Sequence, residues 1–269
     1  MESKIVKDDE AIKNSCCNFY ESDLLDLFLG KTLHPGGEKL TDRLGEILKI
    51  DKGSSLMDMA SGKGVSGIRL AKKFGCLVTG VDISPKNVML SNKLAEEEGL
   101  LGSVKFLRSD AEHIELASSQ FDFVISECAL CTFPNKNVAL EEACRLLRYG
   151  GSIAIAEINL EDGLNEEYNT IAYNVACIAG ALSKDGYVSL LREHGFSDVV
   201  FEDHSDSINT ITDKLRTLVD GWELLGGLSK EISNISSLTP AKARAILDKL
   251  SVEVEKGLLG YGIYSARKC

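Results

Sequence analysis

The sequence predicts an α/β protein built on a doubly wound, mostly parallel sheet of seven strands. Short apolar runs alternate with longer amphipathic stretches from about residue 56 to residue 157, a pattern typical of parallel strands joined by crossover helices. Small residues follow the first apolar run at 60–64, and an acid, Asp82, ends the second. After Leu160 the alternation gives way to helical stretches that precede the last strand.

Turn residues divide the chain into elements. His34-Pro35-Gly36-Gly37 is a turn by composition, Asp51-Lys52-Gly53 is a break before the first strand, and Tyr149-Gly150-Gly151 ends a helix before the fifth strand. The predicted strands are residues 56–59, 77–81, 104–107, 121–126, 152–157, 199–202 and 259–266. The predicted helices are residues 4–30, 41–48, 64–73, 85–98, 137–147, 166–181, 184–194, 208–225 and 240–255.

These elements group into three parts. Residues 1–50 form an N-terminal helical cap or lid, and residues 51–204 together with 258–269 form the core. Residues 205–257 are a helical insertion before the last strand. A chain of 269 residues is long enough for one sizeable core with an appended part.

The charge of the chain limits its partners. Its 30 basic and 41 acidic residues give a net charge of −11, which argues against nucleic acid or an anionic membrane as the main partner. The first ten residues lack an apolar signal region, and no apolar run approaches the ~18 residues of a membrane span. We therefore expect a cytoplasmic protein that acts on a small molecule.

The first strand, the turn and the second strand have the pattern of a nucleoside-binding βαβ unit. Gly62 and Gly64 let the backbone approach a ligand closely, since they adopt dihedrals that a side chain would forbid. Asp82 stands where an acid accepts hydrogen bonds from the two ribose hydroxyls. The turn lacks the G-x-G-x-x-G spacing of a dinucleotide site.

The turn from Asp58 to Gly64 resembles the D/E-x-G-x-G-x-G loop of class I methyltransferases, which use S-adenosylmethionine. Ala60 stands where the first glycine is usual, and we expect its φ to stay negative. The resemblance implies a Rossmann-like fold with an antiparallel end to the sheet. It implies cofactor contacts from Asp58, Ala60, Ser61, Gly62, Gly64, Asp82, Ile83, Asp110, Ala111 and Glu127.

Eight cysteines are unusual in such a chain, and in a reducing cytosol they are expected to be free thiols. Cys76 and Cys144 fit core positions on a strand and a helix. Cys128-x-x-Cys131 has the spacing of a redox or zinc motif, but no second pair completes a zinc site, so no metal is predicted.

Two cysteine segments resemble those of arsenite methyltransferases. Ser126-Glu127-Cys128 resembles the S-N-C segment of that family, and the run that starts at Cys177 resembles its C-[IL]-x-G-A-L segment. Phe19-Tyr20 resembles an F-Y pair near the start of the family. The resemblance covers roughly residues 15–203 and implies transfer of a methyl group to trivalent arsenic.

The chemistry of arsenic agrees with this interpretation. Trivalent arsenic is soft and binds thiolates, as soft metals do, so Cys128 and Cys177 are the expected ligands. Cys16 and Cys17 are further candidates for a third ligand or delivery thiol, and Tyr20 for closing over the cofactor. The arsenic lone pair that attacks the methyl group carries no proton, so this reaction needs no catalytic base. The sequence agrees, since it shows no convincing His–acid or Ser–His pair. The expected partner is a thiol reductant.

Two other functions remain open at this point. The helical insertion favours a methyltransferase that acts on another small molecule, because such insertions often build acceptor pockets. The eight cysteines also fit a thiol-based sensor of metalloids or redox state that retains the fold without catalysis.

Overall fold

The computed structural model describes residues 9, 10, 12, 13, 17, 21, 34–161, 177, 178, 180–224 and 239–269. Most of the helix predicted over 4–30 and most of the helix predicted over 166–181 therefore lie outside the described residues, as do Cys16, Phe19 and Tyr20.

The described chain contains seven strands and the helices between them. The strands are β1 (Ser55–Met59), β2 (Leu77–Asp82), β3 (Val104–Arg108), β4 (Phe121–Glu127), β5 (Leu147–Leu160), β6 (Phe196–Asp203) and β7 (Leu259–Lys268). The helices are α3 (Gly37–Leu48), α4 (Val65–Phe74), α5 (Pro85–Glu97), α6 (Lys136–Leu146), α8 (Lys184–Glu193), α9 (Asp206–Leu224) and α11 (Pro240–Glu255), with a 3₁₀ turn, η1, at Leu130–Thr132.

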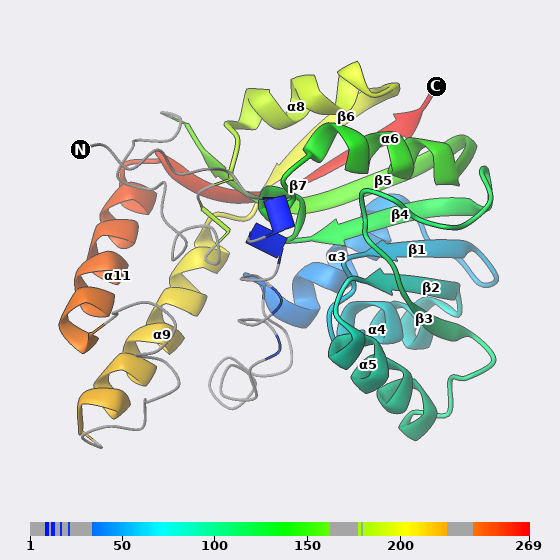
Figure 1. Cartoon of the computed structure of the whole chain (residues 1–269). Helices are drawn as coiled ribbons and strands as arrows, with labels where there is room; N and C mark the ends of the chain where they lie inside the picture. The colour runs from blue at the N-terminus through cyan, green and yellow to red at the C-terminus, as the bar shows by residue number, and fades with distance from the viewer. Residues whose placement is uncertain are drawn as a thin grey trace.

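The strands form one sheet in the order β3-β2-β1-β4-β5-β7-β6 (Figure 1). Neighbouring strands from β3 to β5 run parallel, whereas β7 runs antiparallel to both β5 and β6. The prediction of a doubly wound, mostly parallel sheet of seven strands with an antiparallel end is confirmed.

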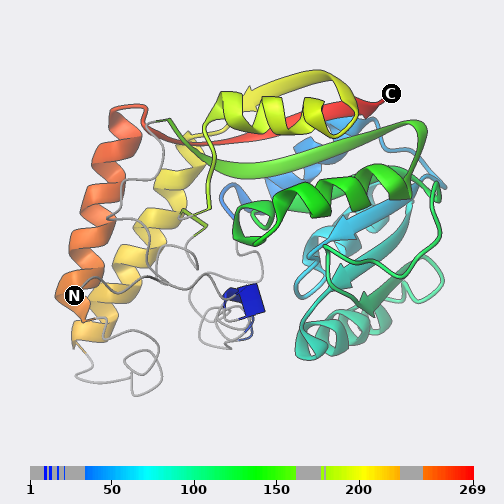
Figure 2. The same cartoon turned by 45° about the horizontal axis from the view of Figure 1, so that its top comes forward.

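Helices cover both faces of this sheet. The helices α3, α4 and α5 lie on one face, and α6 and α8 lie on the other (Figures 1 and 2). The alternation of side chains along the strands explains the arrangement. Leu56 and Ile125 belong to the core on the α3 side, while their neighbours Met57 and Val124 belong to the core on the other side. Burial on both faces makes these strands continuously apolar.

Local signals fix where several helices begin. The side chains of Ser84, Asn135, Ser183 and Thr239 each accept a hydrogen bond from the backbone N–H three residues on, at the starts of α5, α6, α8 and α11. Proline follows the cap in α5 and α11, where its missing N–H has no helical partner to lose.

The helices α9 and α11 pack on each other beside the end of the sheet where β6 ends and β7 begins (Figures 1 and 2). A small apolar cluster of Val219, Ala243, Leu247 and Leu215 joins them, separate from the two cores that flank the sheet. The helical stretches predicted for the insertion thus form a pair of helices. The division into three parts stays a prediction.

Two local expectations were wrong. The segment Tyr149-Gly150-Gly151, expected between a helix and the fifth strand, belongs to β5, and the pairing of β5 with β4 is irregular between Leu147 and Ser152. Ala60 takes a φ of +58° instead of a negative value. This left-handed conformation costs a non-glycine residue about 1–2 kcal/mol, so the surrounding turn imposes it.

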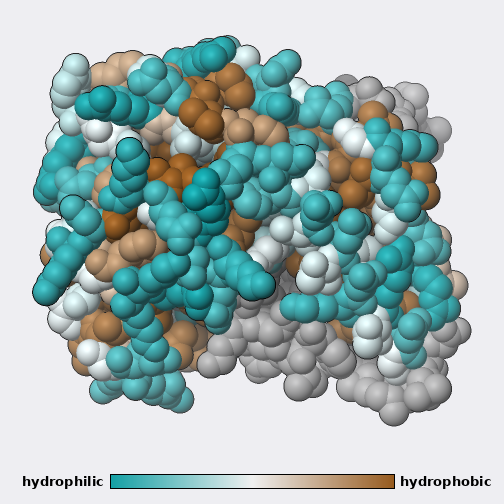
Figure 3. Space-filling view, turned by 180° about the vertical axis from the view of Figure 1, so that it is seen from behind, coloured by the Kyte–Doolittle hydropathy of each residue, from teal (hydrophilic) through white to brown (hydrophobic). Residues whose placement is uncertain are grey.

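The outer surface is mostly hydrophilic on the face shown in Figure 3. Hydrophilic side chains cover most of the face seen from behind, and hydrophobic ones form small areas between them (Figure 3). Within the described ranges, none of the helices combines the length and apolarity that crossing a bilayer requires.

Candidate functional site

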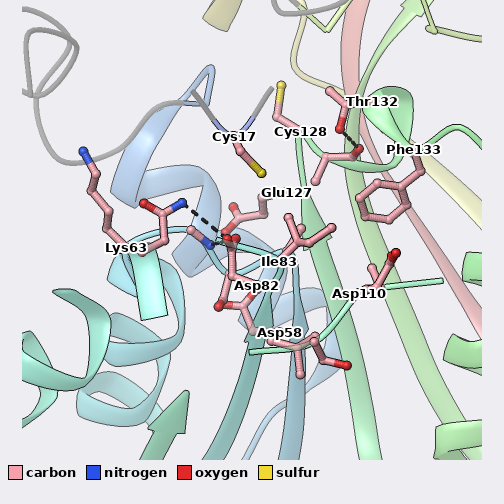
Figure 4. A pocket seen from close by; sticks show the side chains of 18 of the residues that line it. Cys17, Asp58, Lys63, Asp82, Ile83, Asp110, Glu127, Cys128, Thr132 and Phe133 are labelled. Carbon is pink, nitrogen blue, oxygen red and sulfur yellow. Dashed lines mark hydrogen bonds between the residues drawn. The ribbon is translucent and has the colours of Figure 1, made fainter. Parts of the chain in front are cut away.

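A pocket lies at the carboxyl ends of β1, β2 and β4, where parallel α/β sheets bind ligands (Figure 4). Every residue predicted for the cofactor lines it except Gly64 and Tyr20: the lining includes Asp58, Ala60, Ser61, Gly62, Asp82, Ile83, Asp110, Ala111 and Glu127. Gly64 is the adjacent N-cap of α4, and Tyr20 lies outside the described residues.

The turn after β1 is shaped by glycine. Gly62 and Gly64 have φ values of +53° and +77°, which favour glycine. A Cβ on Gly64 would lie 2.5 Å from the Phe106 ring and 2.7 Å from Cβ of Ser91. Gly64 therefore permits close packing of the turn against β3 and α5 while Gly62 faces the pocket.

The Asp82 carboxylate, at the end of β2, accepts three hydrogen bonds. Its Oδ2 accepts from the Gly62 N–H at 2.8 Å, and its Oδ1 accepts from the Ser84 N–H at 2.9 Å and from Nδ2 of Asn87 at 3.3 Å. Burial raises the pKa of Asp82, and the backbone donors oppose that rise. The carboxylate thereby joins the turn after β1 to the start of α5.

The pocket is acidic. Burial raises the pKa of Asp58 well above its usual range, and the nearby carboxylates of Glu127 and Asp82 raise it further. Figure 4 shows these side chains around one hollow, with Lys63 pointing away from them. Such a pocket favours a ligand that carries positive charge.

Residues from the N-terminal part lie over the same pocket. Lys13 Nζ pairs with Oδ2 of Asp110 and with Oε2 of Glu112, both at 2.7 Å. Cys17 lines the pocket, and its pKa rises to about 11, first because of burial and then because of Asp82, Glu21 and Asp110. The structure brings Cys17 to the predicted site.

Cys128 and Cys177 meet at the end of the pocket. The Cys177 thiol donates a hydrogen bond to the carbonyl oxygen of Cys128 at 3.1 Å, although 49 positions separate them. Cys128 lines the pocket directly, and Cys177 is buried behind it. Both residues take a positive φ, +54° and +62°, which residues other than glycine rarely adopt.

Cys131 joins these two thiols. Its side chain interacts with those of Cys128 and Cys177, and it is 2% exposed. Burial, followed by these contacts, raises the pKa of Cys131 well above its usual value. For Cys128, the contact with Cys131 lowers the pKa, but the contact with Cys177 and burial outweigh it. Cys128 and Cys131 are therefore protonated thiols at neutral pH. Among the described residues, no three His, Cys, Asp or Glu side chains are arranged to hold a metal ion.

A buried carboxylate fixes the loop that carries the thiols. Glu157 on β5 accepts hydrogen bonds from the N–H groups of Ala129 (3.1 Å), Leu130 (2.8 Å) and Cys131 (3.3 Å). Burial, and then Cys177, raise the pKa of Glu157 to about 7. Sequence analysis did not single out Glu157, because its partners follow a different strand.

The structure also contains a His–acid pair, so the expectation of none was wrong. The His34 Nε2 lies 3.6 Å from Oε1 of Glu127, and the Thr41 hydroxyl donates to both Glu127 oxygens at 3.0 and 3.2 Å. Nδ1 of His34 lies 3.1 Å from the carbonyl oxygen of Pro35, which fixes the ring with Nε2 toward Glu127. His34 reads as part of a turn in the sequence, and only folding brings Glu127 to it.

The comparisons with known proteins agree with this geometry. The family model of a methyltransferase domain matches residues 50–195, more than half of the 269 residues. The chain belongs to the methyltransferase domain family. With its sheet topology, it is a class I S-adenosylmethionine-dependent methyltransferase.

Relatives of this methyltransferase act on different acceptors. The 27-O-demethylrifamycin SV methyltransferase of Amycolatopsis mediterranei is 28% identical over 92% of the chain and 93% of its own length. An arsenite methyltransferase of Aquipseudomonas alcaligenes is 31% identical over 54% of the chain and 45% of its own length. A putative sarcosine dimethylglycine methyltransferase from Galdieria sulphuraria, 19% identical, shares the fold with a TM-score of 0.77, over 93% of this chain and 98% of that one.

The pocket of the methyltransferase fits S-adenosylmethionine by its own chemistry. Asp58 Oδ2, Ser61 Oγ and Asn87 Oδ1 are buried polar atoms without a hydrogen-bond partner, and all three residues line the pocket. A polar, cationic ligand would satisfy them, and the cofactor carries a sulfonium and an ammonium group. Asn87 is a pocket residue that sequence analysis missed; it reaches Asp82 from the first turn of α5.

Proposed function

We propose that the enzyme transfers the methyl group of S-adenosylmethionine to trivalent arsenic held by the thiols of Cys128 and Cys177. The observation that carries this proposal is the meeting of the two cysteines at one end of the acidic pocket, with Cys177 donating to the Cys128 carbonyl. The partial match to an arsenite methyltransferase supports it.

Protonated thiols suit arsenous acid as the substrate. Each thiol that replaces a hydroxyl group on As(OH)₃ forms one As–S bond and releases one water, so the thiol proton leaves with the hydroxyl. The raised pKa values of Cys128 and Cys131 are therefore compatible with binding. Two protein thiols leave a third position on arsenic for Cys17, Cys131 or a free thiol.

Bound S-adenosylmethionine supplies a methyl group on a positively charged sulfur. The arsenic lone pair attacks that carbon in line. Holding the two atoms about 3 Å apart supplies most of the rate acceleration. Arsenic is oxidised from +3 to +5 in this step. A thiol reductant must return two electrons before another methyl group is added, which makes such a reductant the expected partner.

The variant Cys177→Ser tests the ligand role. We expect arsenite-dependent formation of S-adenosylhomocysteine to fall at least tenfold while the dissociation constant of S-adenosylmethionine stays unchanged. Cys269→Ser, at an exposed position, is the matched control. Wild-type turnover in Cys177→Ser would reject the proposal.

The His34–Glu127 pair favours a second candidate, methylation of an O–H or N–H group on a small organic molecule. Such an acceptor loses a proton, and Nε2 of His34 stands ready to take it, with Glu127 to stabilise the imidazolium. The match to the rifamycin methyltransferase over nearly the whole chain supports this candidate.

The variant His34→Asn separates the two functions. If the acceptor is an O–H or N–H group, we expect its turnover to fall by about 100-fold, because a positioned base contributes about that much. Arsenic carries no proton on its lone pair, so arsenic methylation should stay close to the wild-type rate.

We also infer a cytoplasmic location. The seven described cysteines are free thiols, a state that reducing compartments maintain.

A further inference from the structure

A second pocket lies between the start of α3 and the first turns of α9. Its lining joins segments that are far apart in the sequence: His34, Gly36, Gly37, Glu38, Lys39 and Leu40 on one side, and His204, Ser207, Thr210, Ile211 and Lys214 on the other. Ser207, Thr210, Ile211 and Lys214 recur at three- and four-residue spacing, so they share one face of α9.

Glycine sets how closely the two walls approach. A Cβ on Gly36 would lie 2.8 Å from Cβ of Leu40 and 3.2 Å from Oγ of Ser207. The turn before α3 therefore comes close to α9 where Gly36 meets Ser207.

The lining carries excess positive charge although the whole chain has a net charge of −11. Lys39 and Lys214 are exposed, and neither forms an ion pair with any residue that the structure describes. The one acid of the lining, Glu38, pairs with Arg69 on α4. Glu202 beside the pocket is likewise engaged, by Arg43 at 2.6 Å and His204 at 2.8 Å.

The second pocket differs in charge from the cofactor pocket and shares a wall with it. Asp58, Asp82 and Glu127 make the cofactor pocket acidic. His34 lines both pockets, with Nε2 toward Glu127 on the cofactor side. A molecule in the second pocket therefore lies one side chain away from the site of methyl transfer.

We propose that this second pocket binds the anionic end, a carboxylate or phosphate group, of a small molecule whose other end reaches toward the cofactor pocket past His34. The ammonium groups of Lys39 and Lys214 hold the anion, and the hydroxyls of Ser207 and Thr210 are placed to donate to it. The inference goes beyond the transfer of a methyl group to arsenic and does not depend on it.

The test measures binding of two probes, inorganic phosphate and succinate, to the full chain by titration calorimetry at constant ionic strength. We expect saturable binding of at least one probe, and the stronger of the two identifies the anionic group. The double variant Lys39→Gln/Lys214→Gln should weaken it at least tenfold.

Lys105→Gln is the matched control, since Lys105 is an exposed lysine on β3, away from the pocket. It should bind the probe as the wild type does, and all proteins should bind S-adenosylmethionine equally, which shows that they are folded. Absence of saturable binding of both probes, or equal weakening in the control and the double variant, would overturn the proposal. Because no methyl transfer is measured, the result is separate from the identity of the methyl acceptor.

Discussion

Asp82 shows how one side chain organises the cofactor pocket. Its carboxylate accepts from two backbone N–H groups and from Asn87, and it remains at the pocket wall. Hydrogen bonds to a charged group contribute about 1.5–3 kcal/mol each. The side chain thus both shapes the turn at Gly62 and offers its charge to a ligand.

We expect Asp82→Ala to raise the dissociation constant of S-adenosylmethionine by about 10- to 100-fold, because the loss of one or two charge-assisted hydrogen bonds has that effect. Calorimetry or fluorescence titration measures the constant. Glu97→Ala on the exposed side of α5 is the control. An unchanged constant in Asp82→Ala would exclude Asp82 from the cofactor site.

At the scale of elements, the packing of β2 against β3 depends on a glycine. A Cβ on Gly80 would lie 2.3 Å from Cδ1 of Phe106 and 2.8 Å from Oγ of Ser61. The same Phe106 ring limits Gly64, so one aromatic side chain on β3 holds both the strand and the turn in place.

Gly80→Ala should lower the free energy of unfolding by about 1–3 kcal/mol, the usual cost of overpacking a core. Gly102→Ala is the control: a Cβ there meets nothing within 4 Å, so its effect should stay within about 0.5 kcal/mol. Denaturant titration at 25 °C gives both values. Equal stability of the two variants would show that the Phe106 ring can move aside.

Across the whole molecule, ion pairs between distant elements make stability depend on pH. The Arg43 guanidinium on α3, and then His204, hold the pKa of Glu202 on β6 at about 2, below its usual value. A carboxyl whose pKa is lowered by folding stabilises the protein above the unfolded pKa, near 4.3, and loses this contribution as the pH falls toward 2.

We therefore expect the free energy of unfolding of Glu202→Gln to fall less than that of the wild type when the pH is lowered from 4.5 to 2. The side chain is one-third exposed, so solvent screening reduces the effect to about 1 kcal/mol. Denaturant titrations at several pH values measure it. Glu97→Gln, whose exposed carboxyl pairs with Lys93 within α5, should keep the wild-type acid dependence.

The sequence by itself determined the elements and the cofactor end of the site. Apolar runs buried on both faces, such as the one at Leu56 and Met57, mark parallel strands without knowledge of their partners. Acids and small residues directly after those strands must gather at one edge, because the carboxyl ends of parallel strands share it. Asp82 and Glu127 were predictable for this reason, and the resemblance to class I methyltransferases added Asp58 and Asp110.

Tertiary structure decided which groups meet from separate segments. His34 and Glu127 lie 93 positions apart, and Glu157 binds a loop that follows another strand. The hydrophobic periodicity of the sequence does not predict such contacts, because they depend on strand order and on the path of the turns. The same holds for the second pocket, whose walls come from α3 and α9. The left-handed conformations of Ala60, Cys128 and Cys177 are imposed in the same way, since local sequence disfavours them and only the surrounding packing holds them.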